Sequence, residues 1–159
     1  HLPYHDALDR LLARARGAHG IAVLIDWHSM PEAAARTAVT PRHGKGCDIV
    51  LGDRFGASCH GALMASCFAF MAEARRGAAH NRPYAGGYVL DRHADPAGGI
   101  HALQLEVDRT SYLDSRMAEP GEGFDAMVEL LSALVRRLAG EVAGLGRGGG
   151  GAPWAIAAE

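Results

Sequence analysis

The apolar residues near the N-terminus recur with a helical period, and those that follow form an unbroken run. The first pattern predicts a helix and the second a strand. From Leu2 to Ala15 the apolar residues return every three or four positions, and Gly17 and Gly20 end the pattern. This spacing predicts an amphipathic helix over about residues 3–18. The apolar run that follows predicts a short buried strand from Ile21 to Trp27.

The middle of the chain predicts three more strands and one helix. Strands are expected at Cys47–Gly52, Gly86–Leu90 and Ile100–Val107, where apolar runs are bounded by turn-forming residues. Small and apolar residues from His60 to about Arg76 predict a helix. Residues 29–46 have no periodicity and predict a long loop. We expect the three strands to share one sheet with the first strand.

The C-terminal part of the chain predicts one long helix and a tail. An apolar stripe predicts a helix over roughly residues 123–142. The glycine-rich stretch 146–151 predicts a disordered tail or linker. We therefore expect a single α/β domain over residues 1–145 and a tail over 146–159.

Composition favours one globular domain and argues against several classes of partner. The chain has 159 residues, of which 48% are hydrophobic and 21% charged, as in ordinary globular domains. A formal charge of −2 and scattered basic residues argue against nucleic-acid binding. The longest apolar stretches are too short for a membrane span, and nothing at the N-terminus resembles a signal peptide. We expect a protein that binds neither nucleic acid nor membranes.

The cysteines indicate the redox compartment of the protein, and the first residue indicates that the chain is a fragment. Cys47, Cys59 and Cys67 lack CxxC spacing, which argues against a disulfide framework and a thiolate zinc site and fits a reducing cytoplasm. The chain opens at His1 and enters a predicted helix almost at once. We expect it to be a fragment of a longer gene product.

An acid and an imidazole lie where the first strand ends. Ligand sites in open α/β sheets lie outside the carboxyl ends of the strands. His28 at that point, with Asp26 two residues earlier, can bind a metal through one ring nitrogen while second-shell bonds orient the ring through the other. The alternative is a histidine that bonds a neighbouring loop.

A second candidate lies in the strand expected at Ile100–Val107. Alternation places Gln104 and Glu106 on the face of Ile100, and His101 on the opposite face. A carboxylate among apolar neighbours needs a metal, a cation or water to ionise. Glu106 is therefore a candidate general base, and the equally weighted alternative is an ion pair with Arg109 or another cation.

Five segments together resemble the N-formylglutamate amidohydrolase family. They occur in the order of the family, and the resemblance spans residues 3 to about 138. The segments are Pro3-Tyr4-His5, Ile25–Pro31, Asp48–Gly56, Asn81–Tyr88 and His101–Arg109, the last followed by Tyr112.

The resemblance implies a fold, a metal and a reaction. The fold is a three-layer α/β/α arrangement with a mixed sheet, similar to that of the zinc carboxypeptidases. The implied activity is zinc-dependent hydrolysis of a small N-acyl amino acid such as N-formylglutamate. By this resemblance His28 is a zinc ligand, Asp26 supports it, and Glu106 takes a proton from zinc-bound water and returns it to the leaving amine.

An N-acyl amino acid carries carboxylates, so the resemblance implies cations or amide donors around the substrate. The candidates are Arg54, Asn81, Tyr84, Gly86, Gly87 and Arg109. Structural alternatives stay open, because Arg54 can brace a loop, the glycines can permit a tight backbone path, and Tyr84 or Tyr88 can pack as an aromatic ring. For the other histidines we expect surface or loop roles (His5, His60, His80 and His93) or a structural role (His101).

The chain departs from the family pattern at its beginning. Family members carry an N-terminal region with a His-Ser-Gly segment and an acid that the resemblance makes the other metal ligands, and this chain starts after that region. Two alternatives to the hydrolase therefore stay open. One is a non-catalytic remnant that binds a small carboxylate or a partner chain, and the other is an amidase acting on cell-wall peptides. The sequence does not indicate an oligomeric state.

Overall fold

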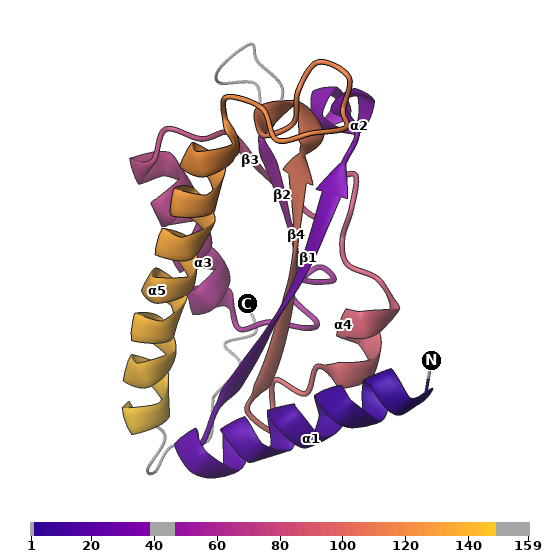
Figure 1. Ribbon diagram of the computed structural model, residues 1–159. Coiled ribbons are helices and arrows are strands. Elements are labelled where there is room, and N and C mark those ends of the chain that lie inside the picture. The colour runs from indigo at the N-terminus through magenta and orange to yellow at the C-terminus, as the bar shows by residue number, and fades with distance from the viewer. Residues whose placement is uncertain (1, 39–46, 149–159) are drawn as a thin grey trace.

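The structure is a computed structural model that describes residues 2–38 and 47–148 (Figure 1). Within these residues, no helix combines the length and the apolar character needed to cross a membrane. The elements in chain order are α1 (Leu2–His19), β1 (Ala22–Met30), α2 (Glu32–Thr37), β2 (Ile49–Gly52), α3 (Gly61–Glu73), β3 (Ala78–His80), α4 (Tyr88–His93), β4 (Ile100–Asp108), the short 3-10 helix η1 (Arg109–Ser111) and α5 (Phe124–Gly148).

The four strands form one mixed sheet in the order β1-β4-β2-β3. β4 runs parallel to β1 along nine residue pairs and antiparallel to β2, which pairs in parallel with β3. The parallel β1 and β4 both end at the edge of the sheet where Met30 and Asp108 pair. Polar residues near the ends of these two strands are therefore brought together, which is the property that the site depends on.

Helices cover both faces of the sheet, so the chain has an α/β fold. On one face α3 and α5 pack over Ile49, Leu51, Leu103 and Leu105, all fully buried. On the other face α4 contacts β4 (Figure 1), and a smaller apolar cluster joins Met30, Val50 and Ala79 to α2. The apolar face holds the larger core, and the opposite face has room for polar side chains.

One predicted strand is wrong and one strand was not predicted. The segment Gly86–Leu90 turns into helix α4 at Tyr88. Gly86 has a φ of +104°, and a Cβ there would lie 2.4 Å from Leu90 Cδ2, so the backbone turns sharply and packs against its own helix. The fourth strand is instead β3, whose Ala-Ala-His sequence has none of the β-branched or aromatic residues that mark a strand.

Two other boundaries differ from the prediction. β1 continues to Met30, and α2 occupies part of the expected loop 29–46, of which residues 39–46 lie outside the described residues. Helix α5 continues through Gly146 to Gly148, although the tail was expected to begin at residue 146. A Cβ on Gly146 would lie 2.8 Å from the His19 carbonyl oxygen, so a glycine allows α5 to pass the end of α1. Residues 149–159 lie outside the described residues.

Candidate active site

The candidate site lies on the polar face of the sheet, where β1 and β4 run side by side. The pairing aligns Asp26 with Gln104 and His28 with Glu106. Because paired residues on neighbouring strands point to the same face and the strands are about 4.8 Å apart, His28 and Glu106 are direct neighbours. The structure thus brings together two residues that lie 78 positions apart in the sequence.

Glu106 is buried and held by a chain of hydrogen bonds. Its carboxylate oxygen Oε1 accepts from Gln104 Nε2 at 2.8 Å, and Gln104 Oε1 accepts from the backbone N–H of Gly87 at 3.2 Å. Burial raises the pKa of Glu106, whereas the charge of His28 and the bond from Gln104 act to lower it. The side chain of Glu106, 7% exposed as a residue, thus combines a fixed orientation with increased basicity.

His28 and Asp26 form a pair at the open side of this face. His28 Nε2 lies 3.0 Å from Asp26 Oδ2, and the His28 side chain is 48% exposed. The contact fixes the ring through one nitrogen, the arrangement that orients metal-binding histidines in other proteins. Among residues 2–38 and 47–148, no group of three or more histidine, cysteine or acidic side chains is placed to hold a metal ion.

Arg54 borders the same face from the turn after β2. Arg54 and Phe55 have φ values of 54° and 58°, and the Arg54 N–H donates to the Ala85 carbonyl at 2.8 Å. These contacts bring the turn against the segment that contains Gly86 and Gly87. The Arg54 guanidinium forms an ion pair with Asp91 of α4 at 2.8 Å and remains partly exposed.

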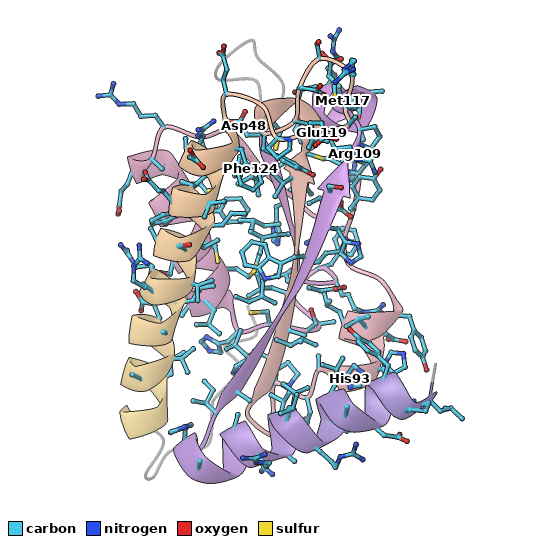
Figure 2. All side chains as sticks on the ribbon, in the orientation of Figure 1. Asp48, His93, Arg109, Met117, Glu119 and Phe124 are labelled. Atoms are coloured by element: carbon cyan, nitrogen blue, oxygen red, sulfur yellow. The ribbon has the colours of Figure 1, made fainter. Side chains whose placement is uncertain are left out.

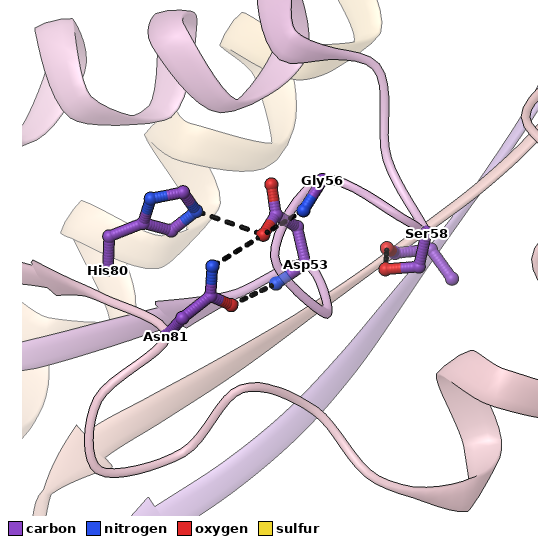
Figure 3. Close-up of polar contacts among 6 residues, drawn as sticks. Asp53, Gly56, Ser58, His80 and Asn81 are labelled. Atoms are coloured by element: carbon purple, nitrogen blue, oxygen red, sulfur yellow. Dashed lines mark hydrogen bonds and ion pairs between the residues drawn. The ribbon is translucent and has the colours of Figure 1, made fainter.

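Asn81 is buried and bonded to Asp53 in both directions, as Figure 3 shows. Its Oδ1 accepts from the Asp53 N–H at 2.9 Å, and its Nδ2 donates to Asp53 Oδ1 at 2.8 Å. The same carboxylate oxygen contacts His80 Nε2 at 2.9 Å and accepts from the Gly56 N–H at 3.0 Å. The amide of Asn81 therefore joins two loops at the ends of β2 and β3.

Tyr84 lies on the polar face, whereas Arg109 contacts the opposite face, which α5 covers. Tyr84 is half-buried against the small cluster that contains Val50. Arg109 follows β4 at the edge of the sheet (Figure 2) and donates from Nε to Ser29 Oγ at 3.2 Å. It lines a cavity of about 570 Å³ between the ends of β1 and β4 and the first turns of α5, together with His28, Trp27 and Tyr112, and Glu106 is not among the lining residues. The Arg109 charge also acts to lower the pKa of Glu106.

Sequence reasoning missed two features of this region and one at the other end of the sheet. It did not single out Gln104 as the link between Gly87 and Glu106, although its place on the face of Glu106 was the available signal. It did not predict the Asp53 carboxylate as a junction of two loops. The expectation of surface or loop roles was wrong for His5 and His93, which are buried between α1 and α4.

The remaining histidines differ in their surroundings. His60 precedes α3, and its Nδ1 accepts from the Ala62 N–H as a helix cap. His101 is buried on the face opposite Glu106, beside the His60 ring. The neutral ring of His101 is favoured, since burial and the nearby His60 lower its pKa.

Comparison with known proteins identifies the family. The family model described as N-formylglutamate amidohydrolase matches residues 1–113. An N-formylglutamate deformylase of Pseudomonas aeruginosa is 33% identical over 141 residues, which is 84% of this chain and 51% of that protein. An N-formylglutamate deformylase of Pseudomonas putida is 37% identical over 114 residues, covering 70% of this chain and 41% of that protein.

Solved structures agree with this assignment. A crystal structure of N-formylglutamate amidohydrolase from Ralstonia eutropha JMP134 superposes with a TM-score of 0.67 at 29% identity and covers 91% of this chain and 49% of that one. A gene product of Agrobacterium tumefaciens, with a TM-score of 0.58 and 21% identity, shares the fold over 88% of this chain and 51% of that one. The chain spans about half the length of the relatives it matches. It belongs to the N-formylglutamate amidohydrolase family.

Proposed function

We propose that this protein hydrolyses the amide bond of a small N-acyl amino acid, with N-formylglutamate as the first candidate, and releases formate and the free amino acid. The observation that carries the proposal is Glu106, a buried carboxylate with a raised pKa, held by Gln104 beside His28. The curated relatives named N-formylglutamate deformylase support the choice of substrate.

Glu106 has the properties that a general base requires. In the proposed reaction its carboxylate takes a proton from water while the water oxygen adds to the formyl carbon. The same proton then passes to the amide nitrogen as the C–N bond breaks, which leaves formic acid and a neutral amine. The acid then gives up its remaining O–H proton, to the amine or to water, and leaves as formate. A raised pKa makes the carboxylate a better proton acceptor, and the bond from Gln104 Nε2 fixes its direction.

The substrate carboxylates need positive or amide partners, and we propose that Arg54 and Arg109 supply the charges. Arg54 reaches the segment of Gly86 and Gly87, whereas Arg109 lies at the end of β4 in the cavity that His28 also lines. Arginine binds carboxylates through two parallel N–H donors. Asn81 and Tyr84 stay predicted substrate contacts, with the amide of Asn81 already bonded to Asp53.

For zinc, we propose His28 as one ligand, with Asp26 orienting its ring. Bound zinc would polarise the formyl carbonyl and lower the pKa of water. A catalytic zinc ordinarily takes three protein ligands, and the described residues contain no such group. The residues present fit one ligand position but do not complete a zinc centre, so no proton transfer given above for Glu106 depends on the metal.

Formate release from N-formylglutamate by this chain, supplied with zinc, tests the proposal. Glu106→Gln keeps the shape of the side chain and its contact with Gln104, and we expect turnover to fall by about 10²-fold to 10⁴-fold. Glu129→Gln, an exposed change on α5, is the matched control and should retain turnover. The proposal is wrong for this chain if the unaltered protein releases no formate or if the Glu106→Gln variant matches it.

A further inference from the structure

Two buried histidines join helices α1 and α4 at the other end of the sheet from Arg109 (Figure 2). His5 of α1 is 3% exposed and His93 of α4 is 5% exposed. His5 Nδ1 lies 2.8 Å from His93 Nε2, and the ring centroids are 5.0 Å apart with the ring planes inclined by 26°, so the two rings meet edge to edge. Direct contact between two imidazoles is only compatible with some of their protonation states, which makes this interface sensitive to protons.

The contact with Asp9 determines which nitrogen of His93 carries the proton. His93 Nδ1 is 2.7 Å from Asp9 Oδ1. A carboxylate accepts hydrogen bonds, so His93 carries a proton on Nδ1 and, when neutral, presents a lone pair on Nε2. His5 then donates its Nδ1–H to that lone pair. If both rings became imidazolium ions, two N–H groups would face each other at 2.8 Å, and the bond between the helices would be lost.

The charges around the pair resist further protonation. On α4, Arg92 Nη2 donates to Asp9 Oδ2 at 3.5 Å, and the Tyr88 ring lies edge-on to His5. On α1, the Tyr4 ring also contacts His5, and Asp6 lies near Arg92. Burial lowers the pKa of His5, as do the charges of His93 and Arg92, while Asp9 acts to raise it. The neutral ring of His5 is therefore favoured at pH 7.

Helix α4 connects this interface to the candidate active site. The helix has six residues, so a shift at His93 is transmitted to its first turn. Gly87, directly before α4, donates to Gln104, which in turn holds Glu106. Asp91 of α4 pairs with the guanidinium of Arg54. Both the proposed base and a proposed substrate contact thus depend on where α4 lies.

We propose that His5, His93 and Asp9 form a proton-sensitive latch that positions α4, and through α4 the side chains of Arg54 and Glu106. His93 and His5 are positioning residues that do not touch the substrate. Their effect on catalysis rests on the proposed function. While both rings are neutral, the bond between them holds α4 against α1, and the gain of a second N–H on facing nitrogens at lower pH weakens this contact.

Thermal unfolding of this chain between pH 7.5 and pH 5.5 tests the latch without any measurement of turnover. The unfolded chain binds a proton at the ordinary histidine pKa near 6.5, whereas folded His5 resists it, so stability falls as the pH falls through this range. In His5→Gln we expect the drop in Tm to be about 2–4 °C smaller than in the unaltered chain. His19→Gln, an exposed histidine of the same helix, is the matched control and should keep the full drop.

Backbone amide NMR signals of α4 and Gly87 test the positioning itself. We expect them to move between pH 7.5 and 5.5 in the unaltered chain and in Glu106→Gln, and to stay constant in His5→Gln. The latch is refuted if the signals do not move in the unaltered chain. It is also refuted if they still move in His5→Gln but stop moving in Glu106→Gln, because titration of Glu106 would then be the cause of the movement. An equal drop in Tm in His5→Gln would also refute it. Failure of the proposed base would appear separately, as retained formate release in Glu106→Gln.

Discussion

The two faces of β4 are buried to nearly the same extent but contribute differently to the molecule. Leu103 and Leu105 are fully buried against α3 and α5, whereas Gln104 and Glu106 are 6% and 7% exposed on the opposite face. The first pair stabilises the fold through apolar burial. The second pair requires hydrogen bonds to be buried at all. The two pairs are similarly buried, but the apolar pair belongs to the core and the polar pair belongs to the candidate active site.

The largest effect on stability is expected on the apolar face. Leu105→Ala should lower the free energy of unfolding by about 2–5 kcal/mol, because it removes a fully buried side chain and leaves a cavity between the sheet and its helices. Chemical denaturation checks this value. The control Leu11→Ala, at an exposed position of α1, should change it by no more than about 0.5 kcal/mol. A small loss in Leu105→Ala would contradict the assignment of this face as the main core.

A buried polar junction should come second. Asp53→Ala leaves the donors of Asn81 and Gly56 without their acceptor, so we expect a loss of about 1–3 kcal/mol in the free energy of unfolding. Asp53→Asn retains one side-chain oxygen and should lose less than Asp53→Ala. Denaturation of both variants measures the difference. Equal stability of the Ala variant and the unaltered chain would show that the junction in Figure 3 does not join the two loops.

Replacement of Glu106 should stabilise the folded chain at neutral pH, whereas replacement of a packing residue destabilises it. Because its pKa is raised in the folded state, the folded protein binds more protons than the unfolded chain above pH 4.5, and stability falls as the pH rises through this range. Glu106→Gln removes this dependence. The free energy of unfolding of the variant minus that of the unaltered chain should therefore be larger at pH 7.5 than at pH 4.5. We expect this change to be smaller than the loss caused by Asp53→Ala. Melting temperatures at the two pH values test the sign, and an unchanged difference would contradict the burial argument.

The sequence allowed much of this comparison to be predicted, because alternation is a local property. The strands around Ile25, Leu51 and Leu105 and the placement of Gln104 and Glu106 on one face follow from periodicity. The segment 86–90 was misread, since its apolar residues resemble a strand while Gly86 turns the backbone into a helix. In that case the tertiary packing of Leu90 decided the structure.

Contacts between distant segments could not be predicted in this way. His5 and His93 are 88 positions apart. His5 lies on the helical face of the buried Leu12, but nothing local indicates that His93 packs against it. The bond between Asp53 and Asn81 likewise joins loops 28 positions apart. The resemblance to the family supplied candidate residues for the site, but only the pairing of β1 with β4 places His28 beside Glu106. Pairing between strands is set by the whole fold and is not recorded in a single segment.

The smallest effect on stability should come from the rim of the polar face. His28 is half-exposed, and its contact with Asp26 faces solvent, where such a pair contributes little. His28→Ala should therefore change the free energy of unfolding by no more than about 0.5 kcal/mol. If His28 is a zinc ligand as proposed, the same variant should lose zinc affinity, measured by titration with a metal-sensitive dye, while Glu129→Gln keeps it. A large loss of stability with unchanged zinc binding would instead show that His28 has a structural role. The comparison of an apolar face that stabilises the fold with a polar face that carries the candidate site would then be wrong for His28.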